Sequence, residues 1–577
     1  MRSTFHLLLV AALFLSACST PGPAEEAPEV TAKRGCGPTL VHDHDWYTSG
    51  KRQPLREGLD GLHYPITTDA SLPQGRRDSV QRYFDQGLML AYGFNHAEAA
   101  RSFWQAALDD TTCAMAWWGF AYVMGPNYNA GMEPDNYQRA WDAVQQAIRR
   151  MDACTTKERD LIDAMAQRYA HEPPEDRAPL DEAYASALRV LAHRYPDDPD
   201  IATLFAESLM DLHPWDLWGR DGGVKPWTPE IIAALERSIK LFPDHPGAHH
   251  LYIHAVEASR SPDRALPSAA YLEHAVPGSG HLTHMPAHIY IRTGRYHQGV
   301  VTNQRSVKAD EKYMAACHAH GIYPLVYFPH NIHFISACAA MGGERELAWE
   351  SALDLRASLA QDLIHAPGFA ALEHYHAYPW MVAVKLGMWD RLARESAPDS
   401  MLYGAALWHF AQGMRQARTG EVSKAQVSLE ALRRLVADER MQTLTIWEVN
   451  TVPGILAVAE PLLRGEILAA QGDLEAAIEA LYRAVDAEDA LQYQEPPDWP
   501  FPVRHDLGAL LLRAGRSAEA EQAYREDLFH WPENGYALQG LRSALRAQDR
   551  HDAARDLGPR IDKAWEHADA AVRTAMR

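Results

Sequence analysis

The sequence predicts an all-α protein built from repeated pairs of helices. Of its 577 residues, 47% are hydrophobic, which is enough for a large buried core. Ala, Leu, Arg and Glu dominate, whereas the alternating Val, Ile and Thr runs typical of strands are scarce. Small residues also recur with the same spacings in two places, Gly465, Gly472, Ala477 and then Gly508, Gly515, Ala520. A recurring frame of this kind predicts stacked helix pairs, because one pair cannot bury its own apolar face.

This frame resembles the tetratricopeptide repeat, in which small residues at repeat positions 8, 20 and 27 let two helices pack closely. Gly87, Ala99 and Ala106 occupy those positions in a first copy. Weaker copies end at the turns Gly294-Arg295-Tyr296, Gly342-Gly343-Glu344, Gly387-Met388-Trp389 and Thr419-Gly420-Glu421. The resemblance implies a right-handed α-solenoid of about nine or ten helix pairs, with the first helix of each pair on the concave side. Two irregular insertions, 211–229 and 317–329, are expected to cap or cross the groove.

The N-terminus predicts export. An apolar run from Leu7 to Phe14 is followed by Leu15-Ser16-Ala17-Cys18, which indicates a cleaved signal peptide over residues 1–17. The spacing resembles a bacterial lipobox, which implies that Cys18 is lipidated; an ordinary secretory signal with a chance cysteine is the alternative. Residues 18–40 would then be the lipidated cysteine and a flexible tether. Ser19 after the cysteine, by resemblance to the enterobacterial sorting rule, suggests the outer membrane, facing the periplasm.

The rest of the chain divides by its repeats into three predicted parts. Residues 41–235 hold N-terminal repeats and an insertion, 236–400 hold His-rich central repeats, and 401–577 hold C-terminal repeats. The formal charge is 55 − 76 = −21, so nucleic acid is not an expected partner. The expected partners are a membrane, through the lipid anchor, and a peptide or envelope protein.

The cysteines fit an oxidising compartment. By their order along the chain, Cys113 with Cys154 and Cys317 with Cys338 are the possible disulfides, and buried free thiols are the alternative.

The 29 histidines concentrate between His245 and His376. Placed in the repeat frame, eight residues fall on concave positions of three neighbouring repeats: His250, His254, Glu257, His281, His284, His288, His330 and His333. His250 and His284 are one repeat length apart, as are His254 and His288, so each pair is expected to lie side by side. Pro286 disturbs this geometry, since its missing N–H favours a helix that starts there and leaves His281 and His284 on a preceding loop.

Such a cluster predicts a metal site. Residues four apart on a helix point the same way, which makes each His-x3-His pair a chelate. Imidazole suits several transition metals, so copper or zinc is expected, with iron as a further candidate. Glu257 could be a ligand, a residue that orients a ligand, or a general base. Histidines that line a polar groove and hydrogen-bond a peptide are the alternative.

Three segments carry a second resemblance: His-His-Leu-Tyr-Ile-His-Ala-Val-Glu-Ala-Ser from His249, Gly-His-Leu-Thr-His-Met-Pro-Ala-His-Ile-Tyr from Gly280, and Pro-His-Asn-Ile-His-Phe from Pro329. They resemble a family of exported bacterial tetratricopeptide proteins, and the resemblance implies the fold and the site but no chemistry. The sequence therefore predicts a metal-binding envelope lipoprotein. A metal-dependent oxidase or hydrolase with Glu257 as candidate base, and a peptide-binding scaffold, are the two alternatives.

Overall fold

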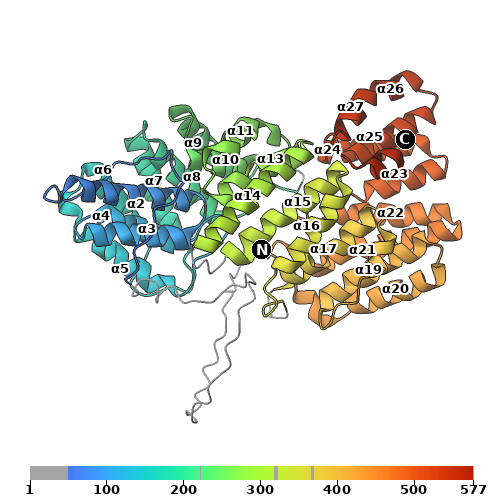
Figure 1. The fold of residues 1–577 in the computed structure, drawn as a ribbon, viewed down its shortest axis with the longest axis horizontal. Helices are drawn as coiled ribbons and strands as arrows, with labels where there is room; N and C mark the ends of the chain where they lie inside the picture. The colour runs from blue at the N-terminus through green and yellow to red at the C-terminus, as the bar shows by residue number, and fades with distance from the viewer. Residues whose placement is uncertain (1–49, 221, 317–322, 365–368, 576–577) are drawn as a thin grey trace, which may run out of the picture.

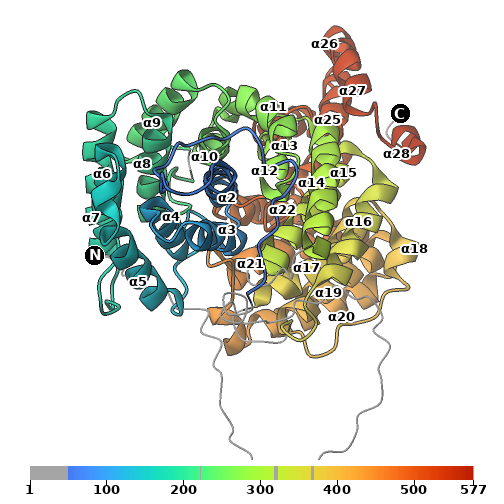
Figure 2. The same ribbon diagram turned by 60° about the vertical axis from the view of Figure 1, so that its left-hand side comes forward.

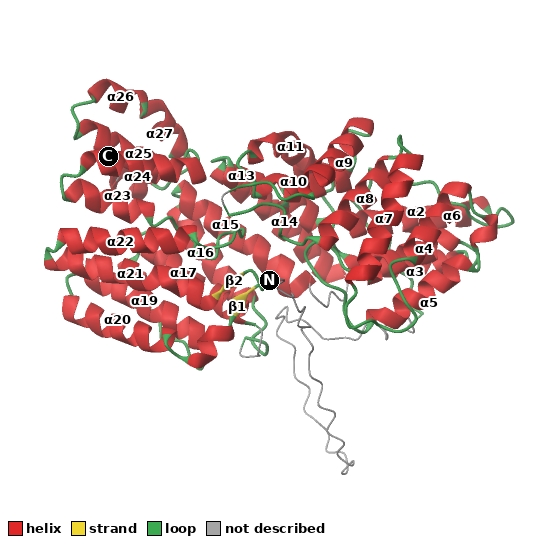
Figure 3. Cartoon of the chain, turned by 180° about the vertical axis from the view of Figure 1, so that it is seen from behind, coloured by secondary structure: helices red, strands yellow, loops and turns green. Residues whose placement is uncertain are grey.

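The structure, a computed structural model, describes residues 50–575 apart from 221, 317–322 and 365–368. The described chain is almost entirely helical (Figures 1 and 3). A short antiparallel pair, β1 (Thr445–Ile446) and β2 (Asn450–Thr451), supplies the strands of the part that is described. The predicted all-α helical-repeat fold is confirmed. The signal peptide, Cys18 and the tether lie outside the described residues.

The N-terminal half contains the helices α2 (Gln74–Tyr92), α3 (His96–Asp109), α4 (Ala114–Met124), α5 (Asn136–Ile148), η1 (Met151–Ala153), α6 (Thr156–Ala166), α7 (Ala178–Arg194), α8 (Pro199–Leu212), α9 (Thr228–Leu241), α10 (Pro246–Glu257), η2 (Pro262–Ala265), α11 (Leu266–Ala275), α12 (Gly280–His284) and α13 (Pro286–Arg292). Sequential helices pack as antiparallel neighbours, as α2 does with α3 and α8 with α9 (Figure 1).

The C-terminal half contains α14 (Tyr296–Ala316), the π-helical turn η3 (Tyr323–Tyr327), α15 (Phe328–Gly342), α16 (Arg345–Ser358), α17 (Ala370–Lys385), α18 (Trp389–Leu392), α19 (Leu402–Arg418), α20 (Val422–Val436), η4 (Glu439–Thr443), β1 and β2, α21 (Val452–Gln471), α22 (Leu474–Asp489), α23 (Arg504–Arg513), α24 (Ser517–His530), α25 (Gly535–Arg546), α26 (His551–Asp556), α27 (Gly558–Ala564) and α28 (Ala570–Ala575).

The buried apolar side chains form two clusters rather than one continuous core. One cluster draws on residues 59–327 and the other on residues 287–572. The two overlap in sequence at α13 and α14, which stand between the two halves of the molecule in Figure 1. The central segment 236–400 therefore contributes to both cores. The boundaries at residues 236 and 400 stay a prediction.

The predicted repeat turns are confirmed by their backbone conformation. The turn glycines Gly294, Gly343, Gly387, Gly420, Gly472 and Gly515 all have positive φ, between 61° and 90°. This left-handed conformation ends a helix and favours glycine, since other residues clash there.

The small residues at repeat position 8 allow the close helix packing that the frame predicts. A Cβ atom added at Gly87 would lie 2.8 Å from the Phe103 ring, and one at Gly465 would lie 2.0 Å from Leu481. At Gly508 it would lie 2.4 Å from the Tyr524 ring. A methyl group at any of these positions therefore forces the paired helix to move.

The variant Gly508→Ala is accordingly expected to lower the free energy of unfolding by about 1–3 kcal/mol through overpacking. Gly75→Ala is the matched control, because a Cβ there meets nothing within 4 Å. Urea denaturation of both variants measures the difference. An unchanged midpoint for Gly508→Ala would mean that α23 and α24 do not need this close approach.

An extended segment, residues 50–72, forms a strap over α2 and α3, drawn in dark blue in Figure 2. Side-chain amides recognise its backbone: Gln86 Oε1 accepts from Arg56 N at 2.8 Å, and Gln81 Nε2 donates to the Tyr64 carbonyl at 2.7 Å. Gly278 N donates to the carbonyl of Gly58 at 2.9 Å, which ties the strap to the loop before α12. The strap thus occupies the N-terminal repeats much as a bound peptide would.

Within the described residues, none of the helices is both long and apolar enough to span a bilayer.

Candidate metal centre

Local sequence fixes the helices that carry the histidines. Pro246 is the first residue of α10, and the His245 side chain caps it by accepting a hydrogen bond from Ala248 N. The Ser279 side chain caps α12 by accepting from Leu282 N. Pro286 is the first residue of α13, as the sequence predicts. The predicted loop before it is wrong, because His281 and His284 lie on the short helix α12, which is continued by α13.

Seven of the eight predicted residues come together at the meeting point of α10, α12, α13 and α15. Six of the histidines form two groups of three, each group with ligand atoms within 4.8 Å of one another. The first cluster is His250, His254 and His281, and the second cluster is His284, His288 and His330. Each cluster contains one of the predicted His-x3-His pairs, so the helical spacing has the expected effect.

Nitrogen atoms approach closely within each cluster. In the first, His250 Nε2 lies 3.1 Å from His281 Nε2. In the second, His284 Nε2 lies 2.8 Å from His288 Nε2 and 3.2 Å from His330 Nε2. Two nitrogens bound to one zinc ion at ~2.0–2.1 Å would be roughly 3.3–3.4 Å apart at a tetrahedral angle. The observed separations are close to those of ligands that share one ion.

Contacts at the Nδ1 atoms orient four of these imidazoles, and three of these contacts are hydrogen bonds. The Nδ1 atom of His250 lies 2.6 Å from the Tyr92 carbonyl, and that of His254 lies 2.9 Å from Glu257 Oε1. His284 Nδ1 lies 2.6 Å from Asn303 Oδ1, and the Asn303 amide nitrogen donates to the Gly299 carbonyl, which fixes the amide orientation. The fourth contact is an ion-pair contact without hydrogen-bond geometry, in which His288 Nδ1 lies 2.5 Å from Glu257 Oε2. Each acceptor places the proton on Nδ1 and leaves a lone pair on Nε2.

Those four lone pairs face the interior of the two clusters. The Nε2 atom of His254 has no hydrogen-bond partner among the described residues. The Nε2 atoms of His284 and His288 face each other with a proton on neither, which is repulsive unless a cation lies between them. Burial lowers the pKa of His284 well below its usual value, which disfavours an extra proton as that cation. A metal ion fits the donor set.

Glu257 lies between the clusters. Its two carboxylate oxygens contact one histidine of each, His254 and His288. Burial alone would raise the pKa of Glu257, but His288 and His254 beside it lower that pKa to about 2. Of the roles that the sequence leaves open, this geometry matches a carboxylate that orients two ligands.

Aromatic rings enclose the clusters. The Phe94 ring lies 4.5, 6.0 and 5.5 Å from those of His250, His254 and His281. The Phe334 ring lies 4.8, 4.8 and 5.0 Å from those of His284, His288 and His330. Each phenyl ring therefore packs against all three imidazoles of one cluster.

Both predicted insertions reach the first cluster. Trp215 of the first insertion packs edge to face on His254, with ring centroids 5.8 Å apart. Tyr327 of the second lies 4.7 Å from the His281 ring. Tyr323 and Tyr327 belong to a π-helical turn, a feature frequent at functional sites. Apart from His330, which is half-buried, no histidine of the two clusters is more than 2% exposed. The two insertions therefore cover the first cluster together with Phe94, which is the capping that the sequence leads us to expect of them.

His333 lies apart from both clusters. Its ring packs against Tyr378 and Tyr375 of α17, at 4.2 and 4.9 Å. Both of its ring nitrogens are buried without a hydrogen-bond partner in the part of the chain described. The assignment of His333 to the metal site stays a prediction that this placement does not favour.

Sequence reasoning missed Phe94, Phe334, Asn303 and Glu495. The Glu495 carboxylate, from the segment between α22 and α23, lies 3.5 Å from His288 Nδ1. Burial, and then the nearby Glu257, raise its pKa well above the ordinary value. No local pattern marks Glu495, because it reaches the site across more than 200 residues of chain.

The expected disulfide between Cys113 and Cys154 is not formed. Both are free, buried cysteines, which is the alternative that the sequence leaves open. Burial raises the pKa of Cys113 to about 12 and that of Cys154 to about 11, so both stay protonated thiols. Cys338 is also free and buried, and its proposed partner Cys317 lies outside the described residues.

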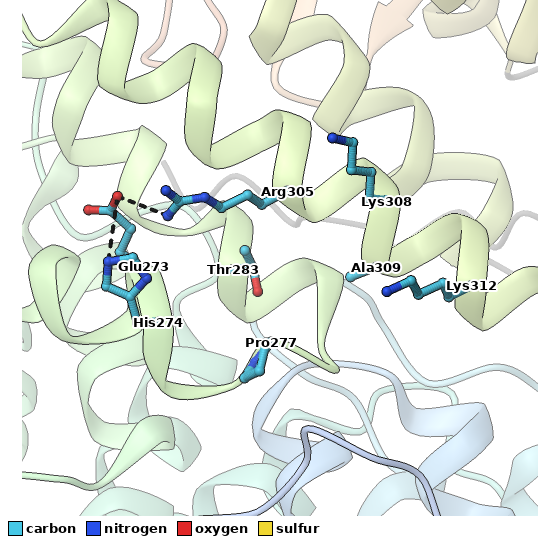
Figure 4. Close-up of a pocket in the computed structure, with 8 residues that line it drawn as sticks. All are labelled: Glu273, His274, Pro277, Thr283, Arg305, Lys308, Ala309 and Lys312. Carbon is cyan, nitrogen blue, oxygen red and sulfur yellow. Dashed lines mark hydrogen bonds and ion pairs between the residues drawn. The ribbon is translucent and has the colours of Figure 1, made fainter.

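A surface pocket between α11 and α14 is separate from the histidines. Its lining includes Glu273, Arg305, Lys308 and Lys312 but none of the clustered imidazoles. Figure 4 shows Glu273 paired with Arg305 and His274, while Lys308 and Lys312 extend along α14. Lysines on an exposed helix face are ordinary solvated groups, and we assign this pocket no function.

The fold and the site define a helical-repeat protein with a buried centre of two histidine clusters. A scan against protein-family models and a search of curated proteins found no match. Among solved structures, the human IFIT1 dimer with PPP-AAAA is similar at 13% identity over 88% of this chain and 99% of its own, with a TM-score of 0.31. The APC/C hetero-tetramer Cut9-Hcn1 is similar at 13% identity over 86% of this chain and 78% of its own, with a TM-score of 0.31. The P58(IPK) TPR domain is similar at 13% identity over 82% of this chain and 98% of its own, with a TM-score of 0.19. We infer nothing about function from similarities this low.

Proposed function

We propose that this protein binds two transition metal ions, one in each histidine cluster. The observation that carries the proposal is the orientation of the imidazoles. His250, His254 and His284 each donate from Nδ1 to an acceptor, and His288 Nδ1 contacts the Glu257 carboxylate, so that their Nε2 lone pairs converge. Metal-binding histidines typically have this second hydrogen bond, which fixes the tautomer and the ring. Copper and zinc suit an all-imidazole donor set best, and iron is the further candidate.

A metal-dependent enzyme is the second candidate, and the number of histidines favours it. Three protein ligands leave a coordination position open, whereas structural sites are usually closed by four. A peptide-binding scaffold would have to use another surface, because the buried histidines cannot contact a peptide. We further propose, from the lipobox alone, that Cys18 anchors the protein to the outer membrane facing the periplasm.

Elemental analysis of protein purified from its native compartment tests the proposal. We expect close to two equivalents of copper or zinc per chain, and a chelator should remove them and lower the melting temperature. Metal-free protein whose melting temperature does not respond to added Cu²⁺ or Zn²⁺ would refute the metal centre. It would leave the histidines as a neutral buried network.

A further inference from the structure

We infer that the two clusters share one small ligand, of the size of hydroxide, azide or dioxygen, held between them. Phe94 and Phe334 act as the residues that exclude anything larger. This inference rests on the proposed function, since it concerns the coordination positions that three histidines leave open at each ion.

The clusters face each other through two pairs of rings. The centroids of His254 and His288 are 5.5 Å apart, and those of His281 and His284 are 5.8 Å apart. Each pair takes one ring from each cluster. Glu257 bridges His254 and His288 from the side, through their Nδ1 atoms. Ions held by the two sets of Nε2 atoms would therefore be neighbours, in the manner of two-metal sites that clamp one bound group.

One phenylalanine packs on each cluster. Phe94 packs against the three rings of the first cluster, and Phe334 packs against those of the second. Both are almost fully buried, at 2% and 0% exposed. A phenyl ring thus packs against each cluster while two pairs of imidazoles face one another across the gap, and we assign the remaining open positions to the side that faces the other cluster.

The backbone at Phe94 supports a dedicated role for this ring. Counting from Gly87 at repeat position 8, Phe94 stands at position 15, where six other copies have a turn glycine. Its φ is +54°, close to the values of those glycines. A bulky residue is strained in this conformation, and such strain is typical of functional sites. Phe94 thus has the backbone conformation of a turn glycine, while its phenyl ring packs against the first cluster.

Burial sets the ligand class. The clustered histidines other than His330 are at most 2% exposed, and Trp215 and Tyr327 close the first cluster from two further sides. A peptide, a sugar or a nucleotide cannot reach the interior, so the ligand class is a small neutral or anionic molecule.

Azide binding to the full chain loaded with Co²⁺ tests the inference, with the visible absorption of Co²⁺ as the readout. We expect saturation at one azide for two Co²⁺ and no spectral response to imidazole. Two independent azides, or imidazole binding as tight as azide binding, would overturn the shared ligand. Failure to bind Co²⁺, Zn²⁺ and Cu²⁺ alike would instead overturn the proposed function, and this inference with it.

The variant Phe94→Gly tests the excluding role without unfolding the turn, since glycine suits the backbone there. It should keep two Co²⁺. Its affinity for imidazole should rise by roughly tenfold or more, because removing a whole phenyl ring makes room for the larger ligand. Phe529→Ala removes an exposed phenyl ring, 65% accessible, and should not respond to imidazole. A Phe94→Gly protein that holds two Co²⁺ and still excludes imidazole would overturn the assignment of Phe94.

Discussion

The double variant His254→Ala/His288→Ala is expected to bind well below one equivalent of metal. Each cluster loses one of its three histidines, and Glu257 loses both of its imidazole partners. Metal that binds only the folded state stabilises it by RT ln(1 + [L]/Kd), about 2.7 kcal/mol at a free metal concentration one hundred times Kd. The melting temperature should therefore fall, and added metal should no longer restore it. Elemental analysis and thermal unfolding with and without chelator measure both effects.

The matched control is His274→Ala/His551→Ala, whose side chains are 71% and 70% exposed. His505, which the repeat frame suggests as a distant control, is less suitable because its Nε2 lies 3.0 Å from the buried Asp527 carboxylate. If the double variant keeps full metal and melts like the wild type, the clustered histidines are not ligands.

The pH dependence of the metal effect has a definite sign. Protonated imidazole cannot ligate, so stabilisation by metal is present above the imidazole range and is lost as pH falls through it. Metal-free protein should also lose stability below about pH 6.5, the ordinary histidine pKa. Burial lowers the pKa of His250 and His281 in the folded state, so the unfolded chain takes up protons that the folded chain does not.

The variant Glu257→Gln is expected to weaken metal binding about 10- to 100-fold, the usual effect of removing a group that orients a ligand. The carboxylate presents an oxygen to each of two imidazoles, accepting from His254 and contacting His288, whereas an amide presents an N–H to one of them. Because Glu257 contacts a histidine of each cluster, affinity should fall for both ions. Metal titration by calorimetry measures the two affinities.

Glu236→Gln is the matched control, since the Glu236 side chain is 48% exposed and pairs with Arg264 on the surface. Unchanged affinities in Glu257→Gln would mean that Glu257 does not position the ligands. A loss confined to one ion would mean that the carboxylate serves a single cluster.

The sequence predicts the parts of the centre that depend on helical and repeat periodicity. The four-residue spacing brings His250 beside His254, and the repeat length brings His254 beside His288. Helix propensity and turn glycines likewise suffice for the all-α repeat fold. These relations are short-range or repeated, so they can be counted along the chain.

The division into two clusters could not be predicted, because it depends on where helices cross. His330 and His333 both appear as groove residues, yet one helical turn of α15 separates them. His330, near the start of α15, reaches back to His284, whereas His333, ~4.5 Å further along the axis, meets α17. Phe94 carries no polar signal, and its importance follows only from its contacts and its φ.

The strap connects the first histidine cluster to the N-terminal part of the described chain. Its hydrogen bond from Gly278 N to the Gly58 carbonyl needs close backbone approach, since a Cβ at Gly278 would lie 2.5 Å from the carbonyl oxygen of Glu57. Gly278 is followed by Ser279, which caps α12, and by His281 of the first cluster. A displacement of the strap at Gly58 would therefore bear directly on the loop that leads into α12 and the first cluster.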